Sequence, residues 1–175
     1  MDTITKKNDS NNLTKVSDEL TSEAFKKLEN EVLKCGKSFD NLNAKYKAVL
    51  TSLETMTGLA LEATERSAAA ASKAAMATIK DTQTARLAAT NGIVVTAVYA
   101  SQAAVTSADA AIEAAGAANA AGAVTAIAAS HHEAALLKAA TESAEAIILA
   151  TESAVTALRM SQEAEKHAKL AKNKK

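Results

Sequence analysis

The residues best suited to chemistry form two small groups of histidine and glutamate. His131, His132 and Glu133 are adjacent in the sequence. Neighbouring residues on a helix point about 100° apart, so two adjacent histidines do not face one metal ion. Glu163 and His167 are four residues apart and share a helix face, but the sequence has no Glu-x-x-His pair of the kind that di-metal helical bundles use. We therefore expect no metal site, and we interpret residues 131–133 as a solvated kink.

The remaining candidates for chemistry are isolated. Asp109 and Glu113 form an acidic pair that we interpret as a surface patch or as salt-bridge partners for another subunit. Cys35 is the single cysteine, and its place in a heptad predicts a small buried hydrophobic residue. The sequence contains no glycine-rich phosphate loop, no nucleophile elbow and no Cys/His/Asp set for a triad. We predict no catalytic residue, no cofactor and no enzymatic activity.

The composition favours long helices. The chain has 175 residues, no proline, five glycines and only 2% aromatic residues. Proline is the strongest helix breaker, and alanine, which dominates the apolar residues here, is the best helix former. We therefore predict an all-α fold with long helices and no β-sheet.

The charge balance argues against a nucleic-acid partner. Lysine plus arginine and aspartate plus glutamate number 20 each, so the net charge is +0. Nucleic-acid binding requires a strong basic excess, whereas a net charge near zero weakens self-repulsion and permits self-association.

An unbroken hydrophobic heptad runs through residues 25–56. The apolar positions alternate at steps of three and four residues, which is the signature of a left-handed coiled coil. They are Phe25, Leu28, Val32, Cys35, Phe39, Leu42, Tyr46, Val49, Leu53 and Met56. The pattern is equally compatible with the core of an antiparallel bundle within one chain and with a seam between chains.

Alanine replaces the larger apolar residues after Gly58. Small residues on a helix face let two backbones approach closely. The sequence predicts a close-packing interface with helices of other copies, formed by Ala103, Ala104, Ala111, Ala114, Gly116, Ala118, Ala121 and Gly122. Larger residues return between Leu137 and Leu158, again near a three-and-four spacing, with Ile147 and Ile148 both fitting it.

Two segments of the alanine-rich region carry no formal charge. Residues 87–108 are long enough to span a bilayer, but Asn91, Gly92, Gln102 and several hydroxyl residues dilute their apolar character. Residues 114–130 are mostly alanine and glycine. We favour burial by other helices over membrane insertion, so a membrane partner is possible but not favoured.

These patterns divide the chain into four parts. We expect a disordered polar arm at residues 1–12, a heptad coiled-coil helix at 13–57, alanine-rich packing helices at 58–130 and an amphipathic helix with a lysine-rich tail at 131–175. Helix ends are predicted near Thr57-Gly58 and at Asn91-Gly92. Gly116 and Gly122 mark either a further break or points of close contact, and Ser130-His131-His132 is a third weak point of the helices.

The function that this pattern favours is structural. We expect a protein that assembles with copies of itself into a filament, ribbon or sheet. The alternatives are a membrane-active, pore-forming or toxin-like helical protein that inserts residues 87–130, and a soluble helical-bundle adaptor. The first ten residues lack the apolar core of a secretory signal, so we expect a cytoplasmic protein or one exported without a cleaved signal peptide.

Overall fold

Three helices make up the part of the chain that the structure describes. The computed structural model describes the backbone of residues 5–129 and 134–173, and the side chains in these ranges from residue 21 onward. The helices are α1 (Thr5–Thr90), α2 (Val94–Ala129) and α3 (Ala134–Asn173). These ranges contain no strand, so the predicted all-α fold is confirmed.

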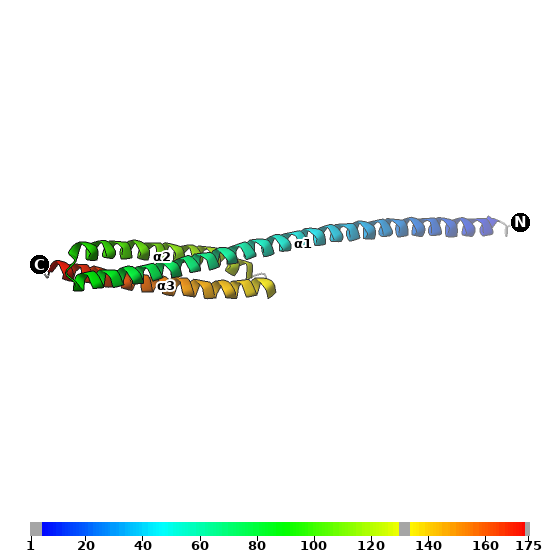
Figure 1. Cartoon of the computed structure of the whole chain (residues 1–175). Coiled ribbons are helices and arrows are strands. Elements are labelled where there is room, and N and C mark those ends of the chain that lie inside the picture. The colour runs from blue at the N-terminus through cyan, green and yellow to red at the C-terminus, as the bar shows by residue number, and fades with distance from the viewer. Residues whose placement is uncertain (1–4, 130–133, 174–175) are drawn as a thin grey trace. The chain divides into compact units, whose positions relative to one another are not determined.

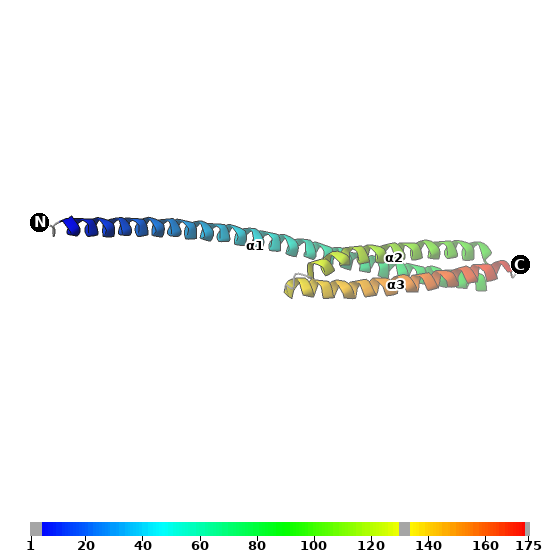
Figure 2. The ribbon, with the colours of Figure 1, turned by 180° about the vertical axis from the view of Figure 1, so that it is seen from behind.

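The chain divides into two compact units, Met1–Thr51 and Ser52–Lys175. The second unit combines the C-terminal part of α1 with α2 and α3. In both views of the ribbon these three segments lie side by side and alternate in direction (Figures 1 and 2). This is the up-down-up arrangement that short connections between helices favour.

A ladder of buried alanines runs along the core of the second unit. Its four clusters each take residues from all three helices, and residue numbers rise along α1 and α3 while they fall along α2. The clusters are Ala68, Ala71, Ala115, Ala118, Ala150 and Ala154; then Ala75, Ala108, Ala111 and Ala157; then Ala85, Ala100, Ala104 and Ala164; and finally Ala88, Ala89, Ala97 and Ala171.

The buried positions of each helix recur at alternating steps of three and four residues. On α1 they include Thr64, Ala68, Ala71, Ala75, Thr78, Thr82, Ala85 and Ala89. On α2 they include Ala97, Ser101, Ala104, Ala108, Ala111, Ala115, Ala118, Gly122 and Thr125, and on α3 Ala150, Ala154, Ala157, Ser161, Ala164, Ala168 and Ala171. This is the spacing that coiled coils use, with small residues in place of leucine and isoleucine.

Small core residues have a defined energetic consequence. Alanine loses no side-chain entropy on burial and favours the helix, and its size lets backbones approach closely. Each buried CH₂-sized group contributes only about 0.8 kcal/mol, however. The stability of the unit must therefore come from many positions along three long helices.

The buried hydroxyl groups are satisfied within the bundle. The Thr82 hydroxyl lies 2.7 Å from the carbonyl oxygen of Thr78 and 2.9 Å from that of Met160 on α3. The hydroxyl oxygens of Ser143 and Thr64 are 3.3 Å apart and link α3 to α1. Among the described residues, no buried side-chain nitrogen or oxygen lacks a partner. Serine and threonine therefore fit this core without a desolvation penalty.

The turn between α1 and α2 lies at Asn91-Gly92, where the sequence predicts a helix end. Gly92 has a φ of 71°, in the left-handed region that glycine adopts without steric cost. The Ile93 N–H donates to the Ala88 carbonyl at 2.8 Å, and the Gly92 N–H donates to the Ala89 carbonyl at 3.4 Å. This pair of bonds is a Schellman cap, which satisfies carbonyls at the end of α1.

The helix end predicted near Thr57-Gly58 is wrong, because α1 continues through it. Helix α2 also continues through Gly116 and Gly122, and of the two alternatives for these glycines Gly122 is a point of close contact. A glycine inside a helix costs about 1 kcal/mol relative to alanine, and the strong helix formers on either side outweigh that cost.

The predicted polar arm at residues 1–12 overlaps the start of α1, which begins at Thr5. The disorder of this arm stays a prediction. Residues 5–12 contain neither proline nor glycine, so nothing in them terminates the helix that follows. The division between the two units after Thr51 falls within the predicted segment 13–57.

Leucine at Ala118 is expected to destabilise the second unit. Ala118 is 0% exposed, so the three added heavy atoms should cost about 1–3 kcal/mol by overpacking. The matched control is Ala117→Leu, at an exposed position of the same helix, which should stay within about 0.5 kcal/mol of the parent. Urea unfolding followed by circular dichroism compares the two. Equal stability of both variants would contradict a tightly packed alanine core.

Candidate interaction surface

The predicted heptad residues form an exposed apolar stripe on α1, which we call the heptad stripe (residues 25–56). Phe25 is 74% exposed and Phe39 is 67% exposed. Every residue from 21 to 49 is exposed, and Leu53 alone among the ten stripe residues is half-buried. Cys35 is exposed too, although the sequence predicts burial.

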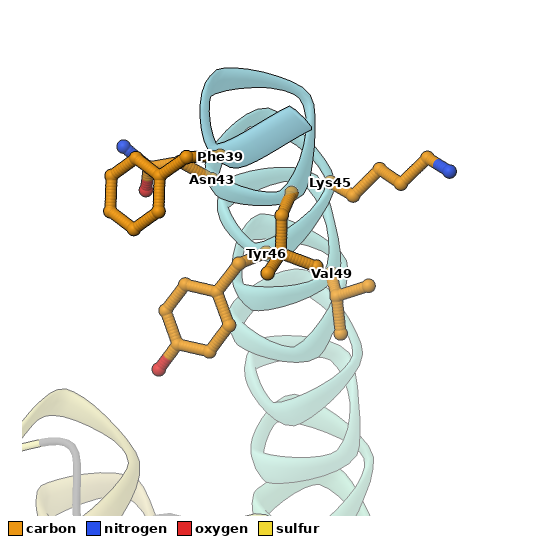
Figure 3. Close-up of a pocket in the computed structure, with 6 residues that line it drawn as sticks. Phe39, Asn43, Lys45, Tyr46 and Val49 are labelled. Carbon is orange, nitrogen blue, oxygen red and sulfur yellow. The ribbon is translucent and has the colours of Figure 1, made fainter. Parts of the chain in front are cut away.

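Two shallow hollows lie along the heptad stripe. One is lined by Phe39, Leu42, Asn43, Lys45, Tyr46 and Val49, and the other by Phe25, Leu28, Glu29 and Val32. The rings of Phe39 and Tyr46 project from the same side of the helix, while Lys45 points away from them (Figure 3). Each hollow contains residues at i, i+3, i+4 and i+7, which is the set that forms the hole for a knob in a coiled coil.

Most of the predicted close-packing residues are used within the chain. Ala104, Ala111, Ala118 and Gly122 are buried in the second unit, and Ala114 and Ala121 are half-buried. Only Ala103 and Gly116 are exposed. The structure thus differs from the prediction that these residues pack against other copies: the buried ones contact α1 and α3 of the same chain.

Gly122 shows how close this packing is. A Cβ added at Gly122 would lie 2.9 Å from the Ser143 Oγ and would clash with the Ile147 side chain. Glycine here leaves the space that Ile147 fills, so α3 approaches the backbone of α2. Ile147 is half-buried as a result, whereas Ile148 is 58% exposed.

Exposed Ile148 belongs to a second apolar stripe, which we call the α3 stripe. Its members recur at steps of four and three residues, and all are exposed: Leu137, Thr141, Ala144, Ile148, Thr151, Val155 and Leu158. The sequence shows the periodicity, but adjacent Ile147 and Ile148 fit two different faces. The residue opposite Ile147 decides between them, and a single sequence does not identify that residue.

The groups considered for chemistry are dispersed. Glu163 and His167 line a hollow between α3 and the C-terminal part of α1, together with Arg86 and Gln83. Asp109 and Glu113 are exposed on α2. The described residues include no group of three or more histidine, cysteine, aspartate or glutamate side chains that could hold a metal ion.

His131, His132 and Glu133 lie outside the described residues, so the predicted kink at this position stays a prediction. The ion pairs that the structure shows are exposed and join residues four apart on one helix: Glu62 with Arg66, Lys138 with Glu142 and Glu165 with Lys169. Such pairs contribute about 0.3–0.5 kcal/mol each and do not build a site.

One helix of the described chain has membrane-compatible character. By length and composition alone, α2 is long and apolar enough to cross a bilayer, since an 18-residue segment of it has a mean hydropathy of 1.3. Only 28% of the residues in that segment are buried inside the structure. The core helix of a soluble protein can pass the same test, so this property alone is weak evidence.

The chain was compared with protein-family models, curated proteins and solved structures, and none of them matches it.

Proposed function

We propose that this chain is a non-enzymatic structural subunit that assembles with copies of itself through helix–helix packing. The observation that carries the proposal is the heptad stripe, which presents large, mostly exposed apolar side chains at coiled-coil spacing. Contiguous exposed apolar surfaces of this kind mark interaction sites. Another copy of the chain supplies a surface of matching period.

The size of the stripe makes its burial favourable. Full burial of a valine, leucine or phenylalanine contributes about 1.5–3 kcal/mol, and the stripe has seven such residues in addition to Cys35, Tyr46 and Met56. Association of two proteins costs about 4–15 kcal/mol in lost freedom. Burial of most of the stripe on both copies exceeds this cost, whereas burial of one or two residues would not.

The α3 stripe supports an open polymer over a closed pair. A single self-complementary surface produces a closed dimer, but a subunit with two separate interfaces can add further copies. Val155 is 62% exposed and Leu158 is 46% exposed, so the α3 stripe is available as the second interface. A filament, ribbon or sheet follows from repeated use of both stripes. The net charge of +0 keeps repulsion between the copies low.

A second candidate function is membrane activity. The length and apolar composition of α2 favour it, since the helix carries only Asp109 and Glu113 as charged residues. In this alternative, residues 87–130 would leave the bundle and insert into a bilayer. The buried alanines of α2 would then exchange helix contacts for lipid contacts, which offers little gain for such small side chains.

Charged substitutions in the heptad stripe and the α3 stripe should each remove one of the two interfaces of the polymer. Leu42→Glu places a carboxylate in the proposed seam, and Val155→Glu does the same in the α3 stripe, so each should leave only the particles that the other interface holds together. The double variant should be a single chain. Light scattering and negative-stain electron microscopy measure the particles.

The control is Ala44→Glu, an exposed apolar-to-acidic change on the other face of the same helix as Leu42, which should assemble like the parent. A parent protein that forms only particles of one or two chains would contradict the polymer and favour a soluble adaptor.

The membrane alternative has its own test. Vesicles of phosphatidylcholine and phosphatidylglycerol filled with a fluorescent dye should remain intact when the parent protein is added at micromolar concentration. Structural assembly predicts this outcome because α2 stays packed in the second unit. Dye release that Ala111→Asp abolishes would instead favour insertion of α2, since an added charge at a helix centre opposes entry into the bilayer.

A further inference from the structure

We propose that the heptad stripes of two copies pair in an antiparallel arrangement, with a two-fold axis at the level of Lys37. This inference rests on the proposed function, because it specifies how the seam between copies is built. It follows from three properties of residues 25–49: the sizes of alternate side chains, the shape of the two hollows and the positions of two opposite charges.

The large and small side chains of the stripe are not randomly distributed. The first position of each heptad holds Phe25, Val32, Phe39 and Tyr46, so all the aromatic residues of the stripe are there. The fourth position holds Leu28, Cys35, Leu42 and Val49. In a parallel pair each layer contains two copies of one residue, so two phenylalanines would meet at one level and two cysteines at the next. Such alternation of overfilled and underfilled layers is unfavourable.

An antiparallel pair combines a first-position residue with a fourth-position residue in every layer. With the axis at the level of Lys37, each layer then joins a larger side chain to a smaller one. The layers are Phe25 with Val49, Leu28 with Tyr46, Val32 with Leu42, and Cys35 with Phe39. Every aromatic ring lies opposite an aliphatic or cysteine side chain, so the volume is nearly even along the seam.

The two hollows accept the side chains that this register brings to them. Val32 of the second copy faces the hollow that Phe39, Leu42, Tyr46 and Val49 line; the rings of Phe39 and Tyr46 lie on one side of the helix (Figure 3). Tyr46 of the second copy faces the other hollow, where Phe25, Leu28 and Val32 contact its ring and Glu29 provides an acceptor for its hydroxyl. Both contacts are knobs in four-residue holes.

The charges beside the seam select the same register. In an antiparallel coiled coil, a residue that directly precedes a first heptad position lies next to a residue of the same heptad position on the other helix. Glu31 and Lys45 both occupy this position, both are exposed, and neither forms an ion pair within the described residues. The register places Glu31 beside Lys45 of the second copy, and the two-fold axis creates this ion pair twice.

Other arrangements lose the charge complementarity. A shift of one heptad in one direction places Glu31 beside Ser38 of the second copy, and a shift in the other direction places it beside Ser52. The parallel pair places Glu31 near Gly36 and Lys45 near Leu50. The register at Lys37 also brings the two copies of Gly36 together, at a position where an added Cβ would meet nothing within its own chain.

The test uses disulfide formation between chosen positions in the full-length chain. Val32→Cys and Leu42→Cys are made separately, each with Cys35→Ser. The antiparallel register places position 32 opposite position 42, while two copies of position 32 are about 15 Å apart along the seam. The two variants are mixed in reducing buffer, transferred to oxidised glutathione and analysed by non-reducing electrophoresis.

A disulfide-linked pair should form in the mixture and in neither variant alone. The parent, with Cys35 only, should also remain unlinked, because two copies of Cys35 are displaced by about 6 Å along the seam before their lateral separation is added. Linked pairs in either variant alone would establish the parallel arrangement and overturn the inference. Assembly by light scattering without any linked pair in the mixture would overturn the register. A parent that light scattering shows to be a single chain would instead overturn the proposed function.

Charge exchange gives an independent measurement that needs no cysteine in the seam. Lys45→Glu faces Glu31 of the second copy at two symmetric points, so the dissociation constant of the pair should rise about tenfold. Glu31→Lys combined with Lys45→Glu should restore the parent value within about threefold. Lys47→Glu, an equal charge change on an exposed position away from the seam, is the control. Equal weakening by Lys45→Glu and Lys47→Glu, or no recovery in the double variant, would overturn the register.

Discussion

Close approach of small side chains is the interaction on which the second unit depends. Where two helix backbones approach closely enough for alanine to contact alanine, leucine or phenylalanine has no space between them. Most larger apolar residues then lie outside, as Leu87, Ile148 and Val155 do, whereas Leu136 near the start of α3 is buried. Ile147 shows the condition for an exception, because it packs where Gly122 leaves the space of a side chain. The alanine core and the exposed α3 stripe are therefore two results of one steric constraint.

Most of the architecture could be predicted from the sequence, because helix propensity and helix period are local properties. The absence of proline and the alanine content predicted long helices, and Asn91-Gly92 predicted the turn, which needs a positive φ at Gly92. The predicted break at Gly58 was wrong because a glycine weakens a helix without ending it. A small-residue face predicts that something packs closely against it, but it does not specify which helix. The structure shows that Ala104, Ala111 and Ala118 contact their own chain.

The residues of the heptad stripe could be predicted from the sequence, but what lies against them could not. All ten members of the heptad stripe were identified from spacing, but burial within the chain and contact between chains require the same spacing. The core positions of α1 were missed because they hold threonine and alanine, although Thr57, Thr64 and Thr78 recur at multiples of seven residues. If the three-and-four spacing of the heptad stripe is extended beyond Met56, it reaches Ala60 and Ala63, whereas the buried positions are Thr57 and Thr64. The spacing of the heptad stripe and the spacing of the alanine core are therefore offset by one residue along the same helix.

The two patterns also contribute to stability in different ways. Each buried alanine in the second unit adds little free energy and requires accurate helix placement, so a single chain gains stability only through the length of the ladder. The heptad and α3 stripes hold the side chains with the largest burial energies, and these act only when another copy covers them. Association that involves only the folded chain shifts the folding equilibrium by mass action. In the proposed assembly, the residues that would stabilise an ordinary core within one chain therefore stabilise it through contacts between chains, and folding becomes linked to assembly.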